Sequence, residues 1–147
     1  VEKGRMALGL GIHGEPGISE TDVPRADELA EIFVERLLGE LPPDIKQIAG
    51  QRVAVILNGL GSVKYEELFV VYRRVAQLLD AAGLQVVEPD VGEFVTSFNM
   101  AGASLTLMWL VHEPGVLWRA PAYAPAFRTG RVLITLPLRA AECCERT

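Results

Sequence analysis

The residue of this sequence with the clearest chemical potential is His13, in the turn His13-Gly14-Glu15-Pro16-Gly17 that follows a short apolar run. An imidazole that is neutral near pH 7 acts as a base or as a nucleophile. Gly11 and Gly14 would let another molecule approach the ring closely. Glu15 could orient the ring or could be solvated. A histidine that only hydrogen-bonds nearby backbone is the commoner alternative, and the residues alone leave both interpretations open.

The same segment matches the glycine pattern of a dinucleotide-binding loop, G-x-G-x-x-G, from Gly9 to Gly14. In that loop the third glycine opens a helix whose N-terminal amides hold pyrophosphate. Here Glu15-Pro16-Gly17 delays the helix, and no acidic residue ends a strand about 20 residues further on. No glycine is followed by Lys-Ser or Lys-Thr, as a P-loop requires. The sequence therefore predicts no nucleotide cofactor on this chain.

Composition and residue spacing exclude several other classes of partner. His13 and His112 lie far apart, and Cys143 and Cys144 are adjacent, so no metal-ligand spacing is present and no metal is predicted. We interpret His112 as a surface residue. The net charge of −5 argues against nucleic-acid binding. No apolar run approaches the roughly 20 residues that span a bilayer. Without a secretory signal pattern or a disulfide framework, a cytoplasmic protein is expected.

The first half of the chain predicts alternating strands and helices. Residues 6–12 are apolar apart from glycines and predict a strand. A helix is expected next, capped by Thr21 or Asp22 and ended by Pro42-Pro43. The β-branched run 53–57 predicts a buried strand. The glycine-rich segment Asn58-Gly59-Leu60-Gly61-Ser62 is either a plain tight turn or an amide cradle for a polar ligand.

The second half begins with a clear helix and then changes character. Periodic apolar residues predict a helix over 64–82 with Gly83 as its stop, followed by a short strand at 84–87. The segments 94–98 and 105–110 predict a hairpin, and β-propensity together with turn hydrogen bonding explains the hydroxyls at their ends. The rest is punctuated by proline and predicts irregular chain, with Val132–Leu136 as one possible edge strand. The order of these elements indicates an α/β fold with a mixed sheet.

Four ordered segments carry a resemblance to a known family. They are GLGIHGEPG at 9–17, VAVILNGLG at 53–61, ELFVVY at 67–72 and VGEFVTSFNMAGASLTL at 91–107. The chain resembles the dihydroxyacetone (glycerone) kinase family, specifically the second half of its substrate-binding K subunit or K domain. The match covers about Met6 to Phe127. Residues 1–127 are therefore assigned to the C-terminal half of a K domain and 128–147 to a divergent tail.

The resemblance implies a fold and a role for the histidine loop. The implied fold is a two-layer α/β domain with a mixed sheet and helices packed on it, related to DegV-like proteins. In this family the histidine at the position of His13 forms a hemiaminal with the carbonyl carbon of dihydroxyacetone, which holds the substrate for phosphoryl transfer to a primary hydroxyl. Gly11, Gly14 and Glu15 would shape the loop or contact the substrate. Glycerol has no carbonyl, so covalent attachment would supply selectivity.

The resemblance also implies components that the chain does not contain. The family's acid–base residues belong to the first K domain, and ATP or ADP with magnesium belongs to a separate L subunit or L domain. The fragment is therefore expected to be inactive alone, and its parent to use either ATP or a phosphotransferase-system donor. A K-subunit homodimer is also implied. The alternative is a non-catalytic ligand-binding or regulatory paralogue of the K subunit.

Overall fold

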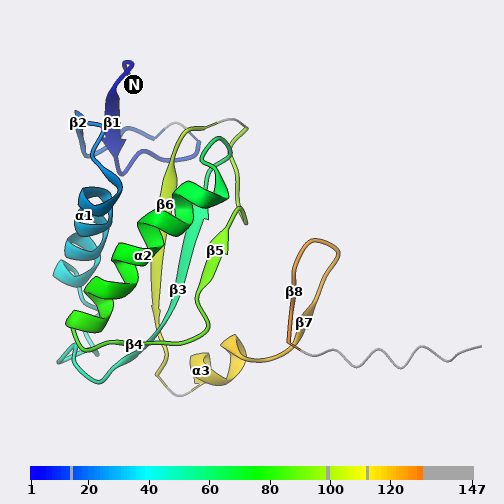
Figure 1. Cartoon of the computed structure of the whole chain (residues 1–147). Helices are drawn as coiled ribbons and strands as arrows, with labels where there is room; N and C mark the ends of the chain where they lie inside the picture. The colour runs from blue at the N-terminus through cyan, green and yellow to red at the C-terminus, as the bar shows by residue number, and fades with distance from the viewer. Residues whose placement is uncertain (14, 99, 112, 131–147) are drawn as a thin grey trace, which may run out of the picture.

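The computed structural model describes residues 1–13, 15–98, 100–111 and 113–130, and its centre is a mixed sheet built on strand β3 (Arg52–Gly59). Strands β4 (Gln85–Val86) and β5 (Asp90–Gly92) pair parallel with β3, and β6 (Ala103–Trp109) pairs antiparallel with it. β3 is almost continuously buried, as its run of β-branched residues predicts. The predicted α/β fold with a mixed sheet is confirmed (Figure 1).

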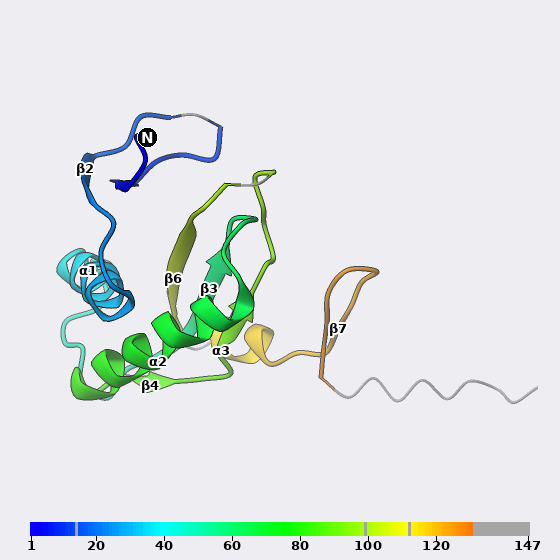
Figure 2. The same ribbon diagram turned by 45° about the horizontal axis from the view of Figure 1, so that its top comes forward.

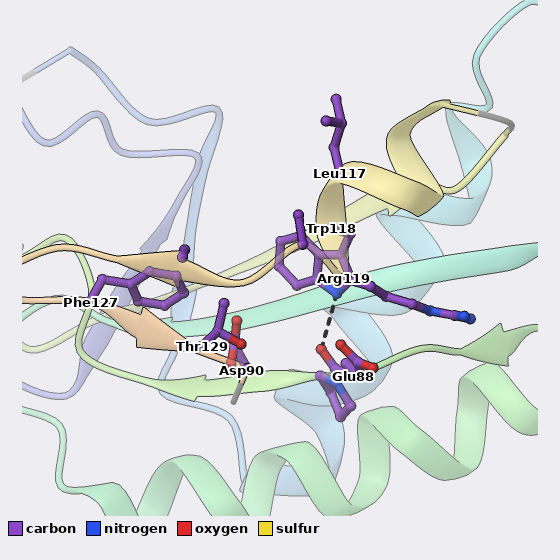
Figure 3. Close-up of a pocket in the computed structure, with 11 residues that line it drawn as sticks. Glu88, Asp90, Leu117, Trp118, Arg119, Phe127 and Thr129 are labelled. Atoms are coloured by element: carbon purple, nitrogen blue, oxygen red, sulfur yellow. Dashed lines mark hydrogen bonds between the residues drawn. The ribbon is translucent and has the colours of Figure 1, made fainter. Parts of the chain in front are cut away.

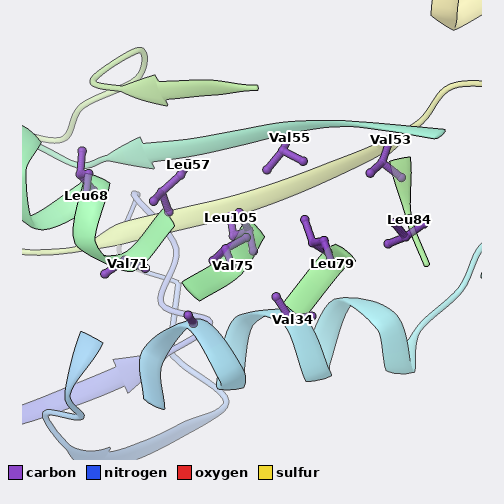
Figure 4. Close-up of a cluster of buried hydrophobic side chains, with 11 residues drawn as sticks. Val34, Val53, Val55, Leu57, Leu68, Val71, Val75, Leu79, Leu84 and Leu105 are labelled. Atoms are coloured by element: carbon purple, nitrogen blue, oxygen red, sulfur yellow. The ribbon is translucent and has the colours of Figure 1, made fainter. Parts of the chain in front are cut away.

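Helices α1 (Ala26–Gly39) and α2 (Tyr65–Ala81) pack against each other and against one face of this sheet (Figures 1 and 2). Because strand side chains alternate between faces, every second residue of β3 points toward the helices. Burial of this aliphatic layer supplies most of the stability of such a domain. The core is drawn in Figure 4 and consists of Ala30 and Val34 from α1, Val53, Val55 and Leu57 from β3, Leu68, Val71, Val75 and Leu79 from α2, and Leu84 and Leu105.

The N-terminal segment forms a separate antiparallel ribbon, β1 (Arg5–Leu8) with β2 (Ser19–Asp22). The first strand is therefore shorter than the predicted 6–12. The predicted helix cap at Thr21 or Asp22 is wrong, because both residues pair with β1. α1 begins only at Ala26, where the side chain of Glu28 accepts the N–H of Arg25 at 2.8 Å. A carboxylate in the first turn is a standard substitute for a missing polar cap.

Two further predictions for the second half are wrong. Residues 94–98 form bends and a turn, so no hairpin exists, and β6 pairs with β3 instead. A short helix α3 (Glu113–Trp118) and a small hairpin of β7 (Ala122–Tyr123) and β8 (Arg128–Thr129) occur where irregular chain was expected. The possible edge strand Val132–Leu136, the residues Cys143 and Cys144, and His112 lie outside the described residues. In the described part of the chain, no helix is long and apolar enough to span a membrane.

Candidate functional site

The histidine loop, residues 9–17, connects β1 to β2. Gly9 adopts φ 71°, a left-handed conformation in which a Cβ would also lie 2.9 Å from the Ile18 side chain. The N–H of Ile18 donates to the carbonyl of Leu8 at 2.7 Å, and the N–H of Gly11 donates to that of Glu15 at 3.1 Å. These bonds close the loop on itself, and the side chain of His13 is left 81% exposed at its end.

The Glu15 carboxylate folds back over this loop. One oxygen, Oε2, accepts the backbone N–H of His13 at 3.1 Å, and the other, Oε1, lies 3.7 Å from His13 Nδ1. A Cβ on Gly11 would overlap this carboxylate. The interpretation that Gly11 makes room for an incoming molecule is therefore revised, because Glu15 fills that room. Gly14 lies outside the described residues.

Asn58, at the end of β3, has a structural role that its sequence context did not predict. Its side chain is nearly inaccessible, and the residue is 7% exposed. Oδ1 accepts the N–H groups of Phe94 at 2.7 Å and Val95 at 3.0 Å, and Nδ2 donates to the carbonyl of Val95 at 2.8 Å. An amide side chain directly after an apolar strand was the available signal. These three bonds hold the 94–95 backbone against the strand end, where a hairpin was predicted.

The glycine-rich segment 58–62 is bound to the chain itself. The N–H of Leu60 donates to the carbonyl of Gly102 at 2.9 Å, and the N–H of Ser62 donates to that of Met100 at 3.1 Å. The prediction of an amide cradle for a ligand is therefore wrong at these two positions, because both N–H groups already donate to backbone carbonyls. The N–H of Ser97 in turn donates to the carbonyl of Leu60 at 2.9 Å. Segments 58–62 and 94–102 thus form one hydrogen-bonded unit.

This unit reaches the histidine loop through Ser97, whose Oγ donates to the carbonyl of Ile12 at 3.4 Å. Three loops that are far apart in the sequence therefore meet at one end of the molecule (Figures 1 and 2). The sequence predicts β-propensity and local turn bonding for the hydroxyl of Ser97, whereas the structure gives it this long-range bridging contact. His13 stands at the junction.

Exposed apolar side chains surround this junction. Leu10 and Ile12 are each 39% exposed, Val95 is 57% exposed and Phe98 is fully exposed. Phe98 also has φ 50°, a strained conformation for a bulky side chain. We call these four residues the apolar rim. In the described ranges, no group of three or more histidine, cysteine or acidic side chains could hold a metal ion, and the absence of a metal stays a prediction.

The chain is similar to known proteins over most of its length. Residues 1–126 match the Dak1 domain. The chain is 63% identical over 138 residues to the L-erythrulose kinase of Pectobacterium atrosepticum, covering 94% of this chain and 23% of that protein. It is 38% identical over 128 residues to the dihydroxyacetone-binding subunit DhaK of a PTS-dependent dihydroxyacetone kinase of Listeria innocua, covering 87% of this chain and 38% of that subunit.

Solved structures show the same fold. The dihydroxyacetone kinase operon co-activator Dha-DhaQ superposes with TM-score 0.71 at 32% identity, covering 82% of this chain and 37% of that one. The dihydroxyacetone kinase of C. freundii superposes with TM-score 0.67 at 26% identity, covering 99% of this chain and 27% of the kinase. The chain thus spans well under half the length of these relatives. It belongs to the dihydroxyacetone kinase K-domain family, the family of the Dak1 domain.

Proposed function

We propose that this chain is the C-terminal half of the substrate-binding K domain of a small-ketose kinase. His13 would bond covalently to the ketone carbon of the substrate, so that a primary hydroxyl is held for phosphoryl transfer. The observation that carries this proposal is the exposed imidazole of His13, with the Glu15 carboxylate 3.7 Å from its Nδ1. Gly11 contributes by leaving room for that carboxylate.

The proposed bond formation balances as a simple addition to the ketone. A carboxylate facing Nδ1 favours the tautomer with its proton on Nδ1, which leaves Nε2 as the nucleophile. Nε2 attacks the carbonyl carbon, the electron pair of the C=O bond moves to oxygen, and that oxygen gains a proton as Nδ1 loses one. The product is a neutral hemiaminal, and no oxidant or metal takes part.

We propose ketoses of three or four carbons as the substrate class. Relatives named as erythrulose kinases are 63% and 54% identical to this chain, whereas the named dihydroxyacetone-binding subunits are 40% identical or less. Erythrulose and dihydroxyacetone both carry a ketone beside a primary hydroxyl, so one hemiaminal mechanism serves both. Glycerol lacks the ketone and would be rejected. We therefore place erythrulose ahead of dihydroxyacetone.

The remaining components of the reaction would lie outside this chain. We propose that the first half of the K domain supplies the acid–base residues and that an L subunit or L domain carries ATP or ADP with magnesium. The apolar rim supports this, because apolar side chains at an exposed junction are commonly covered in the complete protein. A K-domain homodimer and a cytoplasmic location belong to the same proposal. The chain alone would be inactive.

A second candidate is a ligand-sensing regulator built on the same fold. The observation that favours it is the similarity to the Dha-DhaQ co-activator, with TM-score 0.71 at 32% identity. A sensor would use the same covalent capture of a ketone without phosphoryl transfer. Turnover by the complete protein separates the two candidates, because a sensor binds the ketose and does not consume it.

The covalent step can be tested in a complete K domain that carries this segment. Erythrulose labelled with carbon-13 at its ketone should lose its ketone resonance and gain a protein-bound tetrahedral carbon resonance. His13→Ala should abolish that bound signal, whereas Gln47→Ala, an exposed residue of a distant loop, should keep it. A bound tetrahedral signal that survives in His13→Ala, or none in the unaltered protein, would refute the histidine as the attachment point.

A further inference from the structure

A cavity of about 490 Å³ lies away from the histidine loop, between the segment 88–90 and the chain from α3 to β8 (Figure 3). We propose that it binds a small organic cation, a primary amine joined to an aromatic or aliphatic body. Its volume lies in the range of small-molecule sites, roughly 300–1,000 Å³. Its lining combines two carboxylates, Glu88 and Asp90, with the rings of Trp118 and Phe127.

The carboxylates make the floor of the cavity negative. Asp90 pairs with Ile56 across β3 and β5, so its side chain projects from the sheet face opposite to the helices. Burial, and after it the charge of Glu88, raises the pKa of the Asp90 carboxyl above its ordinary value. Among the ion pairs of the described residues, none includes Glu88 or Asp90. A bound ammonium would relieve this uncompensated repulsion.

The position of Arg119 strengthens this argument. It is the one cationic residue that lines the cavity in the described part of the chain. In Figure 3 its side chain extends away from Asp90 and Thr129, on the side of Glu88, and it forms no ion pair with either carboxylate among the described residues. The negative charge of the floor therefore disfavours anions and favours cations over neutral ligands of the same shape.

Both aromatic side chains are held in place by contacts with neighbouring residues. Trp118 Nε1 donates to the backbone carbonyl of Glu88 at 3.3 Å, which ties the indole to the segment that carries the carboxylates. Phe127 packs edge-on against Phe94, with ring centroids 6.2 Å apart. An ammonium group near such rings gains a cation–π attraction of about 0.5–2 kcal/mol. The aromatic rings therefore favour an organic ligand, and the two carboxylates favour one that is positively charged.

Backbone strain coincides with this floor. Glu88 adopts φ 45°, a left-handed conformation that a residue with a long side chain rarely adopts. Such conformations persist where the surrounding structure enforces them, and they concentrate at binding sites. The Trp118 indole N–H donates to the carbonyl of this same residue at 3.3 Å. The strained residue is therefore part of the proposed site.

The test compares three probes of nearly equal shape on the 147-residue chain. 2-Phenylethylamine is positive, 2-phenylethanol is neutral and phenylacetate is negative. The indole N–H resonance of Trp118 in a nitrogen-15 spectrum reports occupancy, because that N–H lies at the cavity. We expect the amine to shift this resonance with a millimolar Kd, the alcohol to bind at least about tenfold more weakly, and phenylacetate to produce no shift.

Asp90→Asn keeps the shape of the side chain and removes its charge, so it should weaken amine binding at least about tenfold. Asp44→Asn is the matched control, because Asp44 is an exposed carboxylate on a distant loop. Equal binding of amine and alcohol, unchanged binding in Asp90→Asn, or no binding of the amine would each overturn the proposal. Should Asp90→Asn not fold, Trp118→Leu replaces it with the Phe127 ring resonances as readout, and unchanged affinity there overturns the proposal equally.

Discussion

Replacing Asn58 by alanine should be among the most damaging single substitutions in the loops of this domain. The change removes three hydrogen bonds of 2.7, 2.8 and 3.0 Å between one buried side chain and the backbone of Phe94 and Val95. Each such bond contributes about 0.5–1.5 kcal/mol net. Phe94 and Val95 are 44% and 57% exposed, so water can partly replace the lost partners. The free energy of unfolding should fall by about 2–4 kcal/mol.

Urea denaturation, monitored by circular dichroism, measures this loss of free energy. In thermal unfolding the same loss should lower Tm by roughly 5–15 °C for a domain of this size. Hydrogen exchange supplies the local readout, because the amides of residues 94–98 should exchange faster while those of β3 stay protected. Gln47→Ala is the matched control. Its side chain makes one exposed bond to the carbonyl of Ala49 at 3.2 Å, and its loss should cost less than about 0.5 kcal/mol.

A loss of less than about 1 kcal/mol in the free energy of unfolding of Asn58→Ala would refute this expectation. A fall in stability with unchanged amide exchange at residues 94–98 would refute it as well, because the loss would then not come from the hydrogen bonds of Asn58. Asn58→Asp adds a graded test. The carboxylate retains two acceptors for the N–H groups of Phe94 and Val95, but it loses the donor to the Val95 carbonyl. Its second oxygen would face the Val95 carbonyl, two acceptors with no proton between them, so the ionised variant should be less stable than the original chain and should regain stability as the pH falls and the carboxyl is protonated.

Three further outcomes are expected. Gly11→Ala should displace the Glu15 carboxylate and reduce formation of the ketose adduct at least about tenfold in a complete K domain. Gly39→Ala is the control, because it has open space at its Cβ and should raise the free energy of unfolding by about 0.5–1 kcal/mol. Equal adduct formation in the two variants would contradict the role of Gly11. Asp90→Asn should raise Tm at pH 7 and leave it unchanged near pH 3. The raised folded-state pKa means that ionised Asp90 destabilises the fold, and this cost appears only as pH rises. A stabilisation that is the same at both pH values would contradict this. The 147-residue chain with ATP and magnesium should not phosphorylate erythrulose or dihydroxyacetone in a coupled ADP assay. Measurable turnover would contradict the proposal that the acid–base residues and the nucleotide site lie outside this chain.

Local sequence predicted the parts of the fold that short-range periodicity controls. The helix predicted over 64–82 is observed as Tyr65–Ala81, and the run 53–57 lies within β3, Arg52–Gly59. In both cases the pattern of apolar residues matches the period of one regular element. The segment 94–98 has the same β-branched and aromatic composition as a strand and is not one. Asn58, more than thirty residues away, takes the N–H groups that a hairpin partner would need.

The sequence by itself determined two long elements of the core and, through the order of its motifs, the family. It also predicted the histidine loop as the place of chemistry, and that remains a prediction. Only the tertiary structure decided what surrounds His13. Glu15 occupies the space over Gly11, and Ser97 joins the loop at 94–98 to the carbonyl of Ile12. The physical reason is the sequence separation of the interacting residues. Helices and strands depend on neighbours within a few residues, whereas the contact of Ser97 with Ile12 joins segments that only the completed fold brings together.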